Sequence, residues 1–402
     1  MEKELQFQHF LQKNWEKANF ENYTPIQEAL MPTMLEKKDI IAQSPTGTGK
    51  TLAYGLPLLE NINAAEKSIQ AVVIAPTKEL VMQIHAVFQE YTQGSDITGT
   101  TLIGGVNTQR QVDKLKKKPH YIIGTPSRIM ELYRNKKVKL HEVKTIVVDE
   151  ADVIYDMKLM NDVEAIVKAT MKDRQLVFIS ATISPAIKEK ALVLSNEPAI
   201  ITITTEATPT SVEHLYIVSE RRDKIENLRR IVRHDQQMKA LIFFSGHLKL
   251  EEIESKLAYQ GITVGVLSGQ ATKQERQKVM RDFRNSDHAL LLATDLAARG
   301  LDISGLTHVI HFDVAESEKQ FIHRSGRTGR MGNQGTVLSL ITAFEEAQLV
   351  KWSRKLHVEP KQVMLRHTAL VPAEHSKKPA STSSAQQGKA KALKKKSYNK
   401  KR

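Results

Sequence analysis

Short apolar runs alternate with longer amphipathic stretches along most of the chain. The runs are rich in Val, Ile and Leu and fall into two sets: 39–43, 71–75, 121–124, 145–148, 176–180 and 199–204, then 214–218, 240–244, 262–267, 289–293, 307–312 and 336–341. Near-continuous apolar runs predict strands that are buried on both faces of a parallel sheet. Helical periodicity marks segments between them, including 25–37, 78–91, 251–259 and 273–283. Because strand–helix alternation favours right-handed crossovers, the pattern predicts a doubly wound α/β sheet, formed twice.

The alternation is interrupted at residues 205–211. This stretch (TEATPTS) is polar and contains a proline, so we expect it to link two domains, at 1–204 and 212–370. The last segment, 371–402, has almost no bulky apolar residues and cannot bury enough surface to fold. We therefore expect a disordered tail after the second domain.

Positive charge is concentrated in that tail. The chain has 59 Lys+Arg against 45 Asp+Glu, a formal net charge of +14, and the tail alone has ten Lys/Arg and one acid. So dense a basic run is typical either of a solvated tail that aids solubility or of non-specific contact with nucleic acid. We favour nucleic acid, because lysines beside phosphates release counterions on binding.

The composition excludes several classes of protein. The absence of cysteine rules out disulfides, a thiolate zinc site and a cysteine nucleophile. No apolar run approaches the ~20 residues that cross a bilayer, and the N-terminus (MEKELQFQHF) lacks the layout of a signal peptide. We expect a cytoplasmic protein with no membrane segment.

The strongest local motif, at residues 44–51, lies between an apolar run and a helical stretch. Its glycines allow backbone N–H groups to surround phosphate oxygens at a helix N-terminus, where Lys50 can reach the β- and γ-phosphates and the Thr51 hydroxyl can coordinate Mg²⁺. A P-loop normally begins with Gly, where this chain has Ser44, and the alternative is a plain turn before a helix. The expected phosphate-binding residues are Ser44, Pro45, Thr46, Gly47, Thr48, Gly49, Lys50 and Thr51.

Two carboxylates follow the apolar run at 145–148. Asp149 suits a metal ion, through a water molecule, and Glu150 is placed to orient or deprotonate the water that attacks the γ-phosphate. Two acids after a strand would by themselves be typical of a solvated turn. Together with an upstream P-loop, they predict NTP hydrolysis.

The second half of the chain contains three arginines among glycines, at residues 323–330 (HRSGRTGR). Arginine makes bidentate contacts with phosphate, and an arginine from another domain can stabilise charge in the transition state. If the two domains close on one nucleotide, Arg327 and Arg330 complete the site only in the closed state.

With these motifs, the chain resembles the DEAD-box ATP-dependent RNA helicases of superfamily 2 over roughly residues 7–345, and residues 149–152 read Asp-Glu-Ala-Asp. The resemblance implies two tandem RecA-like domains. It also implies ATP as the nucleotide, because Gln27 matches the glutamine of the family's Q motif, which reads the adenine edge. For the aromatic residue that stacks on the base we choose Phe7, with Phe10 as the alternative; packing of an N-terminal helix is an equally good interpretation of both. Asp302 is expected to contact the ribose.

The resemblance further implies contacts with the RNA backbone. Lys78 stands where the family usually has arginine, so the bidentate fork is lost. The implied RNA-binding residues are Pro76, Thr77, Lys78, Gly104, Gly105, Thr125, Pro126, Arg128 and Thr294. Residues implied to couple hydrolysis to strand separation are Asp152, Ser180, Thr182 and His323. Because this set contains no aromatic platform, we expect sequence-independent recognition of phosphates and 2′-hydroxyls.

We therefore expect a monomeric RNA helicase that uses ATP and Mg²⁺. RNA-stimulated hydrolysis would be coupled to domain closure, and unwinding or remodelling of RNA would be local and non-processive. Two alternatives remain: an ATP-gated RNA clamp or scaffold without net unwinding, and a DNA-directed helicase. Comparing RNA-stimulated with DNA-stimulated hydrolysis separates the RNA helicase from the DNA-directed one.

Overall fold

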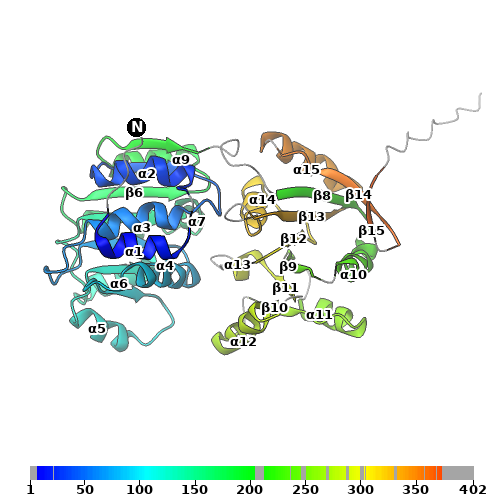
Figure 1. The fold of residues 1–402 in the computed structure, drawn as a ribbon, viewed down its shortest axis with the longest axis horizontal. Helices are drawn as coiled ribbons and strands as arrows, with labels where there is room; N and C mark the ends of the chain where they lie inside the picture. The colour runs from blue at the N-terminus through cyan, green and yellow to red at the C-terminus, as the bar shows by residue number, and fades with distance from the viewer. Residues whose placement is uncertain are drawn as a thin grey trace, which may run out of the picture.

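The computed structural model contains two α/β domains, arranged side by side along the long axis of the molecule (Figure 1). The structure describes residues 7–20, 22–203, 212–235, 237–245, 250–268, 271–286, 289–298, 303, 305–329, 333–356, 358–367 and 369–373. The expected linker at 205–211, the ribose contact by Asp302, the phosphate contact by Arg330 and the tail beyond residue 373 lie outside these residues.

The first domain is built on a seven-stranded sheet with the order β3-β4-β2-β5-β6-β1-β7. All its strand pairs are parallel. The strands are β1 (Ile40–Gln43), β2 (Ala71–Ile74), β3 (Gly99–Leu102), β4 (Tyr121–Gly124), β5 (Thr145–Asp149), β6 (Gln175–Ser180) and β7 (Ala199–Thr202). The predicted doubly wound fold is confirmed. Strand β3 was not predicted, because its two threonines interrupt the apolar pattern.

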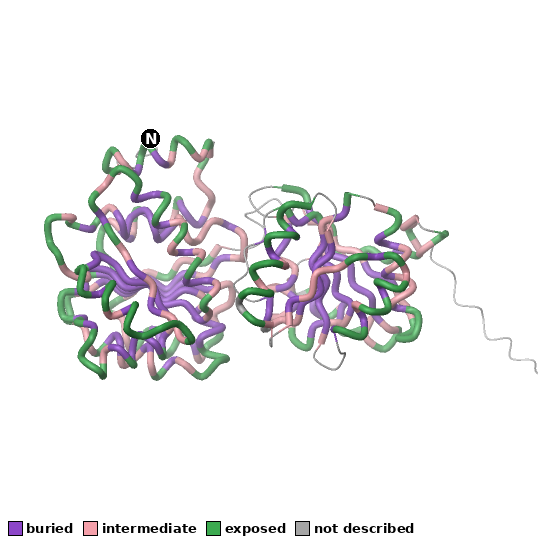
Figure 2. The backbone as a smooth tube through the Cα atoms, turned by 90° about the horizontal axis from the view of Figure 1, so that it is seen from below, coloured by how far each residue is buried: buried purple, intermediate pink, exposed green. Residues whose placement is uncertain are grey.

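Helices cover both faces of this sheet. They are α1 (His9–Lys17), α2 (Pro25–Leu35), α3 (Lys50–Glu60), α4 (Lys78–Tyr91), α5 (Thr108–Lys116), α6 (Pro126–Arg134), α7 (Ala151–Asp156), α8 (Met160–Lys168) and α9 (Pro185–Leu194). Successive strand residues point to opposite faces. Val73 and Val147 therefore pack in one core with α1–α4, whereas Val72 and Val148 pack in a second core with α5–α9. Figure 2 shows the buried strands at the centre of each domain.

The second domain repeats this plan. Its eight-stranded sheet has the order β10-β11-β9-β12-β13-β8-β14-β15, so β8–β14 reproduce the order of β1–β7 strand for strand. The strands are β8 (Val212–Val218), β9 (Lys239–Phe243), β10 (Gly265–Leu267), β11 (Ala289–Ala293), β12 (His308–His311), β13 (Gly335–Ile341), β14 (Lys361–Arg366) and β15 (Ala369–Pro372). Only β15 is antiparallel to its neighbour.

The helices of the second domain follow its strands in the same way. They are the 3₁₀ helix η2 (Arg221–Asp223) and the α-helices α10 (Lys224–His234), α11 (Leu250–Tyr259), α12 (Lys273–Arg284), α13 (Asp295–Ala298), α14 (Glu318–Ser325) and α15 (Ala343–Lys355). The second domain was expected to end at residue 370, but β15 continues to Pro372. Within the described part of the chain, no helix is both long and apolar enough to cross a membrane.

Candidate active site

The phosphate loop joins β1 to α3 and is held in place at its start. The Ser44 N–H donates to the Ser180 carbonyl at 3.0 Å, and the Ser44 and Thr48 hydroxyls hydrogen-bond at 2.8 Å across the loop. Gly49 has φ +84°, and a Cβ there would lie 2.6 Å from Gln27 Nε2. Serine in place of the usual first glycine therefore braces the loop, while Gly49 remains the position that cannot carry a side chain.

Lys50 is the first residue of α3, and its side chain folds back into the loop. The Lys50 ammonium donates to the Ser44 carbonyl at 2.9 Å and to the Pro45 carbonyl at 2.7 Å. The N-terminus of this 11-residue helix carries a partial positive charge. A cation and a helix N-terminus at one loop make a site for anionic oxygens.

The N-terminal end of α2 lies against the same loop. The Thr24 hydroxyl donates to the Thr48 carbonyl at 2.7 Å, and Gln27 Nε2 donates to the Gly49 carbonyl at 3.3 Å. Gln27 Oε1 accepts from the Thr24 N–H at 2.9 Å, and Gln27 is buried. The structure thus places Gln27 beside the phosphate loop, and its contact with adenine remains a prediction.

Phe7 packs on the apolar core that includes α1–α4, and Phe10 packs on the same core. The adjacent residue Gln8 is bound to Glu60, the last residue of α3, through its N–H at 2.7 Å and through its side chain at 2.9 Å. These contacts agree with packing of an N-terminal helix, and the stacking of Phe7 on the base stays a prediction.

The two carboxylates after β5 differ in their surroundings. Asp149 is 3% exposed, accepts from the Tyr54 hydroxyl at 2.9 Å and from the Glu150 N–H at 2.8 Å. Burial raises the pKa of the Asp149 carboxyl to about 6, and the charge of Glu150 acts in the same direction. Glu150 has φ +47° and is half-buried. A left-handed glutamate at a strand end is strained backbone of the kind that gathers at functional sites.

Asp152 connects the two domains. Its N–H donates to Ser180 Oγ at 3.2 Å, and its Oδ2 accepts from Thr182 at 2.6 Å and lies 3.2 Å from His323 Nε2. Burial alone would raise the pKa of the Asp152 carboxyl, but the hydrogen bond and charge of His323, with further contributions from Lys319 and Thr182, hold this pKa below its usual range. The structure therefore brings all four predicted coupling residues together across the interface.

The arginine segment of the second domain lies on the phosphate loop of the first. At Gly326, φ is −70° and any residue would be allowed, but a Cβ would lie 1.5 Å from Thr46 Oγ1. Arg327 follows at 8% exposure, and its Nε donates to the His323 carbonyl at 3.2 Å. Arg324 is different, because its guanidinium is 1% exposed and forms a bidentate pair with Asp295 at 2.8 and 2.7 Å. Arg324 thus anchors α14 within its own domain.

Most expected RNA contacts lie on loops at the carboxyl edges of the sheets. Thr77 caps α4 by accepting from the Leu80 N–H at 3.2 Å, and the Lys78 ammonium lies 2.7 Å from where a Cβ of Gly105 would be. Gly105 has φ +71°. A cation above an open glycine turn suits a phosphate oxygen.

Arg128 does not share this arrangement. Its guanidinium is 6% exposed, is paired with both oxygens of Glu131 at 2.7 and 2.6 Å, and donates to Thr108 at 2.8 Å. An arginine that is buried and paired in this way is withdrawn from solvent, which argues against the predicted contact of Arg128 with an RNA phosphate.

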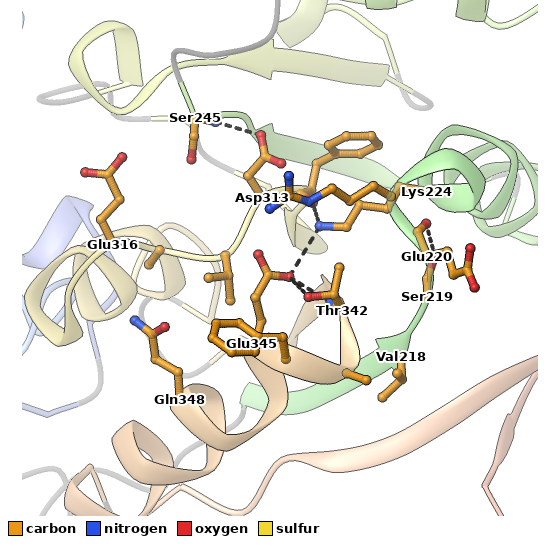
Figure 3. Close-up of a pocket in the computed structure, with 16 residues that line it drawn as sticks. Val218, Ser219, Glu220, Lys224, Ser245, Asp313, Glu316, Thr342, Glu345 and Gln348 are labelled. Carbon is orange, nitrogen blue, oxygen red and sulfur yellow. Dashed lines mark hydrogen bonds and ion pairs between the residues drawn. The ribbon is translucent and has the colours of Figure 1, made fainter. Parts of the chain in front are cut away.

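A cavity of the second domain lies at the carboxyl ends of its strands. It has a volume of about 1120 Å³ and is lined by the residues that follow β8, β9, β12 and β13 (Figure 3). Lys224 points into it, donates to the Phe312 carbonyl at 2.9 Å and lies 3.8 Å from Glu345. The cavity is lined by acids of its own, including Glu220 and Glu316, which disfavour a phosphate ligand.

Tandem parallel-sheet domains with a phosphate loop on one side of the interface and arginines on the other define a two-domain P-loop motor. A model of the DEAD/DEAH box helicase family matches residues 24–190, and a model of the helicase conserved C-terminal domain matches residues 223–332. The chain is 50% identical to the DEAD-box ATP-dependent RNA helicase CshC of Bacillus cereus, over 93% of this chain and 97% of that protein.

It is also 46% identical to the probable ATP-dependent RNA helicase YfmL of Bacillus subtilis, over 88% of this chain and 93% of that protein. Its fold is similar to that of S. cerevisiae Dbp5 bound to RNA and ADP BeF3, with a TM-score of 0.81 and 28% identity over 89% of this chain and 94% of that one. The chain belongs to the DEAD/DEAH box family of ATP-dependent RNA helicases, and membership makes it an ATP-hydrolysing helicase.

Three site residues had not been singled out from the sequence. Tyr54 lies in a helix whose apolar pattern suggests only packing. Lys319 spans the interface to Asp156 at 2.6 Å, and Gly326 fits against Thr46, but both contacts join segments far apart in the chain. For Tyr54, the one local signal in the sequence is its position one helical turn after Thr51, which places both side chains on the same face of α3.

Proposed function

We propose that this protein hydrolyses ATP·Mg²⁺ between its two domains and uses domain closure to separate short RNA duplexes locally, without processive movement. The observation that carries the proposal is the fit of Gly326 against Thr46, because it sets the arginine segment directly on the phosphate loop. The link from His323 to Asp152 at 3.2 Å supports the same closed arrangement.

The nucleotide would be held mainly by the first domain. Lys50 and the N-terminus of α3 would bind the phosphates, and Gln27 would recognise the base. Mg²⁺ is a hard cation that prefers oxygen and usually keeps several waters, so the Thr51 hydroxyl and Asp149 carboxylate fit it as a partial ligand set. In the described part of the chain, no group of three or more acidic or histidine side chains forms a complete metal cage. Mg²⁺, when bound, would neutralise charge on the phosphates.

Hydrolysis would require both domains. Glu150 would orient the attacking water and accept its proton, while Arg327 and Arg330 would stabilise the charge that develops on the transferred phosphoryl group. Because Arg327 belongs to the second domain, opening of the interface removes this stabilisation. Hydrolysis would then be tied to closure.

RNA would bind as a single strand along the carboxyl edges of both sheets. Lys78 and the Gly104–Gly105 turn offer a cation and open backbone, and Thr77, Thr125 and Thr294 offer hydroxyls. Contacts of this kind recognise the backbone, not base edges. The names of the relatives and the RNA in the Dbp5 structure support RNA as the ligand. The basic residues after 373 would add non-specific attraction.

The test is Glu150→Gln in the full chain, with exposed Glu142→Gln as the matched control. We expect RNA-stimulated ATP hydrolysis to fall by about 10³-fold, while ATP-dependent RNA binding is kept. The control should behave as wild type. Hydrolysis by Glu150→Gln at the wild-type rate would contradict the assignment of the base.

Two further results would favour one of the alternative functions over the proposed one. Equal stimulation of the wild-type protein by RNA and DNA would indicate a DNA-directed motor. ATP-dependent RNA binding and hydrolysis without separation of a short duplex would indicate an RNA clamp or scaffold.

A further inference from the structure

Tyr54 is a buried phenol that the proposed mechanism leaves unused. It lies on α3, one helical turn after Thr51, and its side chain is fully buried. A buried tyrosine hydroxyl normally requires a hydrogen-bond partner. The partner of the Tyr54 hydroxyl is a group expected at the metal, Asp149.

The hydroxyl of Tyr54 links α3 to the end of β5. Its oxygen lies 2.9 Å from Asp149 Oδ2. The other oxygen of Asp149 accepts from the Glu150 N–H at 2.8 Å. With both oxygens engaged, the plane of the Asp149 carboxylate is fixed.

The direction of the hydrogen bond between Tyr54 and Asp149 can be assigned. An ionised carboxylate only accepts hydrogen bonds, so Tyr54 donates its single hydroxyl proton to Asp149.

The geometry points to Tyr54 as a positioning residue for Mg²⁺, which holds the Asp149 carboxylate in the orientation that the ion requires. The inference rests on the proposed assignment of Asp149 to Mg²⁺. Partners that orient metal ligands in this way typically contribute 10–100-fold to metal affinity.

The test is Tyr54→Phe in the full chain, which removes one hydroxyl and keeps the ring. Binding of a fluorescent ADP analogue is measured in EDTA and across a series of Mg²⁺ concentrations. We expect the affinity in EDTA to equal that of wild type and the Mg²⁺ concentration at half-effect to rise about tenfold or more.

Tyr121→Phe is the matched control. Tyr121 is 1% exposed and packs in the same apolar core, with Phe88 between the two tyrosine rings at 5.2 and 6.4 Å. Tyr121 begins β4 and is level with Ala71 and Thr145, at the opposite end of the strands from Asp149. Its Mg²⁺ dependence should be that of wild type.

Two results would overturn the inference: an unchanged Mg²⁺ requirement in Tyr54→Phe, or an equal loss of affinity in EDTA, which would show a purely structural role. If nucleotide binding by the wild-type protein itself does not depend on Mg²⁺, the proposed metal site is wrong and the inference falls with it. The wild-type titration therefore separates the two failures.

Discussion

Lys50 and Lys224 occupy the same place in the two halves of the molecule, since each opens the helix that follows the first strand of its sheet. Lys50 follows a loop with two left-handed glycines and bonds to the carbonyls of that loop. Lys224 follows 219–223 (SERRD), which contains no glycine, and it is 3% exposed and bonded to Phe312. The same fold thus carries a lysine that faces a phosphate loop and a lysine that is built into the core.

The surroundings of the two lysines complete the contrast. Beside Lys50 stands a strand that ends in Asp149 and Glu150, and the arginine segment of the other domain comes to the same loop. Beside Lys224 stands Glu345, and burial lowers the pKa of the Lys224 ammonium, although Glu345 opposes the shift (Figure 3). Loop backbone and neighbouring charge, more than the fold, therefore distinguish the carboxyl edge proposed to bind nucleotide from the other one.

The largest effect should come from exchanging these lysines for alanine. Lys50→Ala should reduce RNA-stimulated ATP hydrolysis by about 10²–10³-fold, because a preorganised cation at the phosphates is lost. Lys224→Ala should leave hydrolysis per folded molecule unchanged and lower stability by about 1–3 kcal/mol, because a buried hydrogen bond is broken. Steady-state ATPase assays and urea unfolding test both. Loss of hydrolysis in folded Lys224→Ala would contradict the comparison.

The second-largest effect should come from Gly326, where the second domain contacts the phosphate loop of the first. Gly326→Ala should reduce RNA-stimulated hydrolysis by about 10²-fold, because a methyl group there collides with Thr46 and keeps Arg327 away from the phosphates. ATP binding to the first domain should be unchanged, since Gly326 belongs to the second. Nucleotide titration and ATPase assays give both values. Wild-type hydrolysis in this variant would show that the contact is dispensable.

Acid should weaken the second domain. Burial lowers the pKa of His214 to about 4 and that of His311 well below its usual range. Below about pH 6.5 the unfolded chain binds protons at these histidines and the folded chain does not, so stability falls as the pH drops from 6.5 toward 4. His214 alone would account for about 3 kcal/mol.

The two tryptophans allow this acid effect to be assigned to a domain. Trp15 lies in the first domain and Trp352 in the core of the second, so Trp15→Phe leaves a fluorescence reporter of the second domain. Urea unfolding of this variant should show a free energy of unfolding that falls from pH 7 to pH 4. His214→Leu should reduce the pH dependence of this free energy. A pH-independent midpoint would contradict the prediction.

The smallest effect should come from the Lys319–Asp156 pair across the interface. The pair is 26% and 47% exposed, so its contribution is about 0.5–1 kcal/mol. Lys319→Glu and Asp156→Lys should each raise the RNA concentration for half-maximal hydrolysis by about 2–5-fold, and the double exchange should restore it in part, because Lys319 also contacts Asp152. RNA titrations at two salt concentrations test this, since salt should shrink the difference. Failure of the double exchange to recover would show that the two charges do not interact.

How much could be predicted from the sequence depended on whether the signal was local. The phosphate loop and the Asp149–Glu150 pair are contiguous, and each follows an apolar run, so both could be read directly. Strand β3 (Gly99–Leu102) was missed because its threonines interrupt the apolar pattern, and β14 and β15 follow the last apolar run that we assigned to a strand.

Interactions between distant segments could not be read in this way. The sequence offers arginines near residue 327 but does not say that Gly326 touches Thr46, which is 280 positions earlier. The packing of the segment that contains Phe7 could not be read for the same reason, because the attachment of Gln8 to Glu60 is a tertiary contact. Lys319 and Tyr54 could not be identified from the sequence, because their roles depend on contacts with Asp156 and Asp149, which are distant in the chain.

The strand order has a consequence for synthesis on the ribosome. Among the described strands, none of one sheet pairs with the other, and the first sheet is complete at Thr202, before β8 begins at Val212. Domains generally fold as units, the N-terminal one first. A nascent chain therefore acquires the phosphate loop and Asp149 before Arg327 has been translated. Under the proposed mechanism, such a chain would hold nucleotide without cleaving it, and turnover would start only once the second half has emerged and folded.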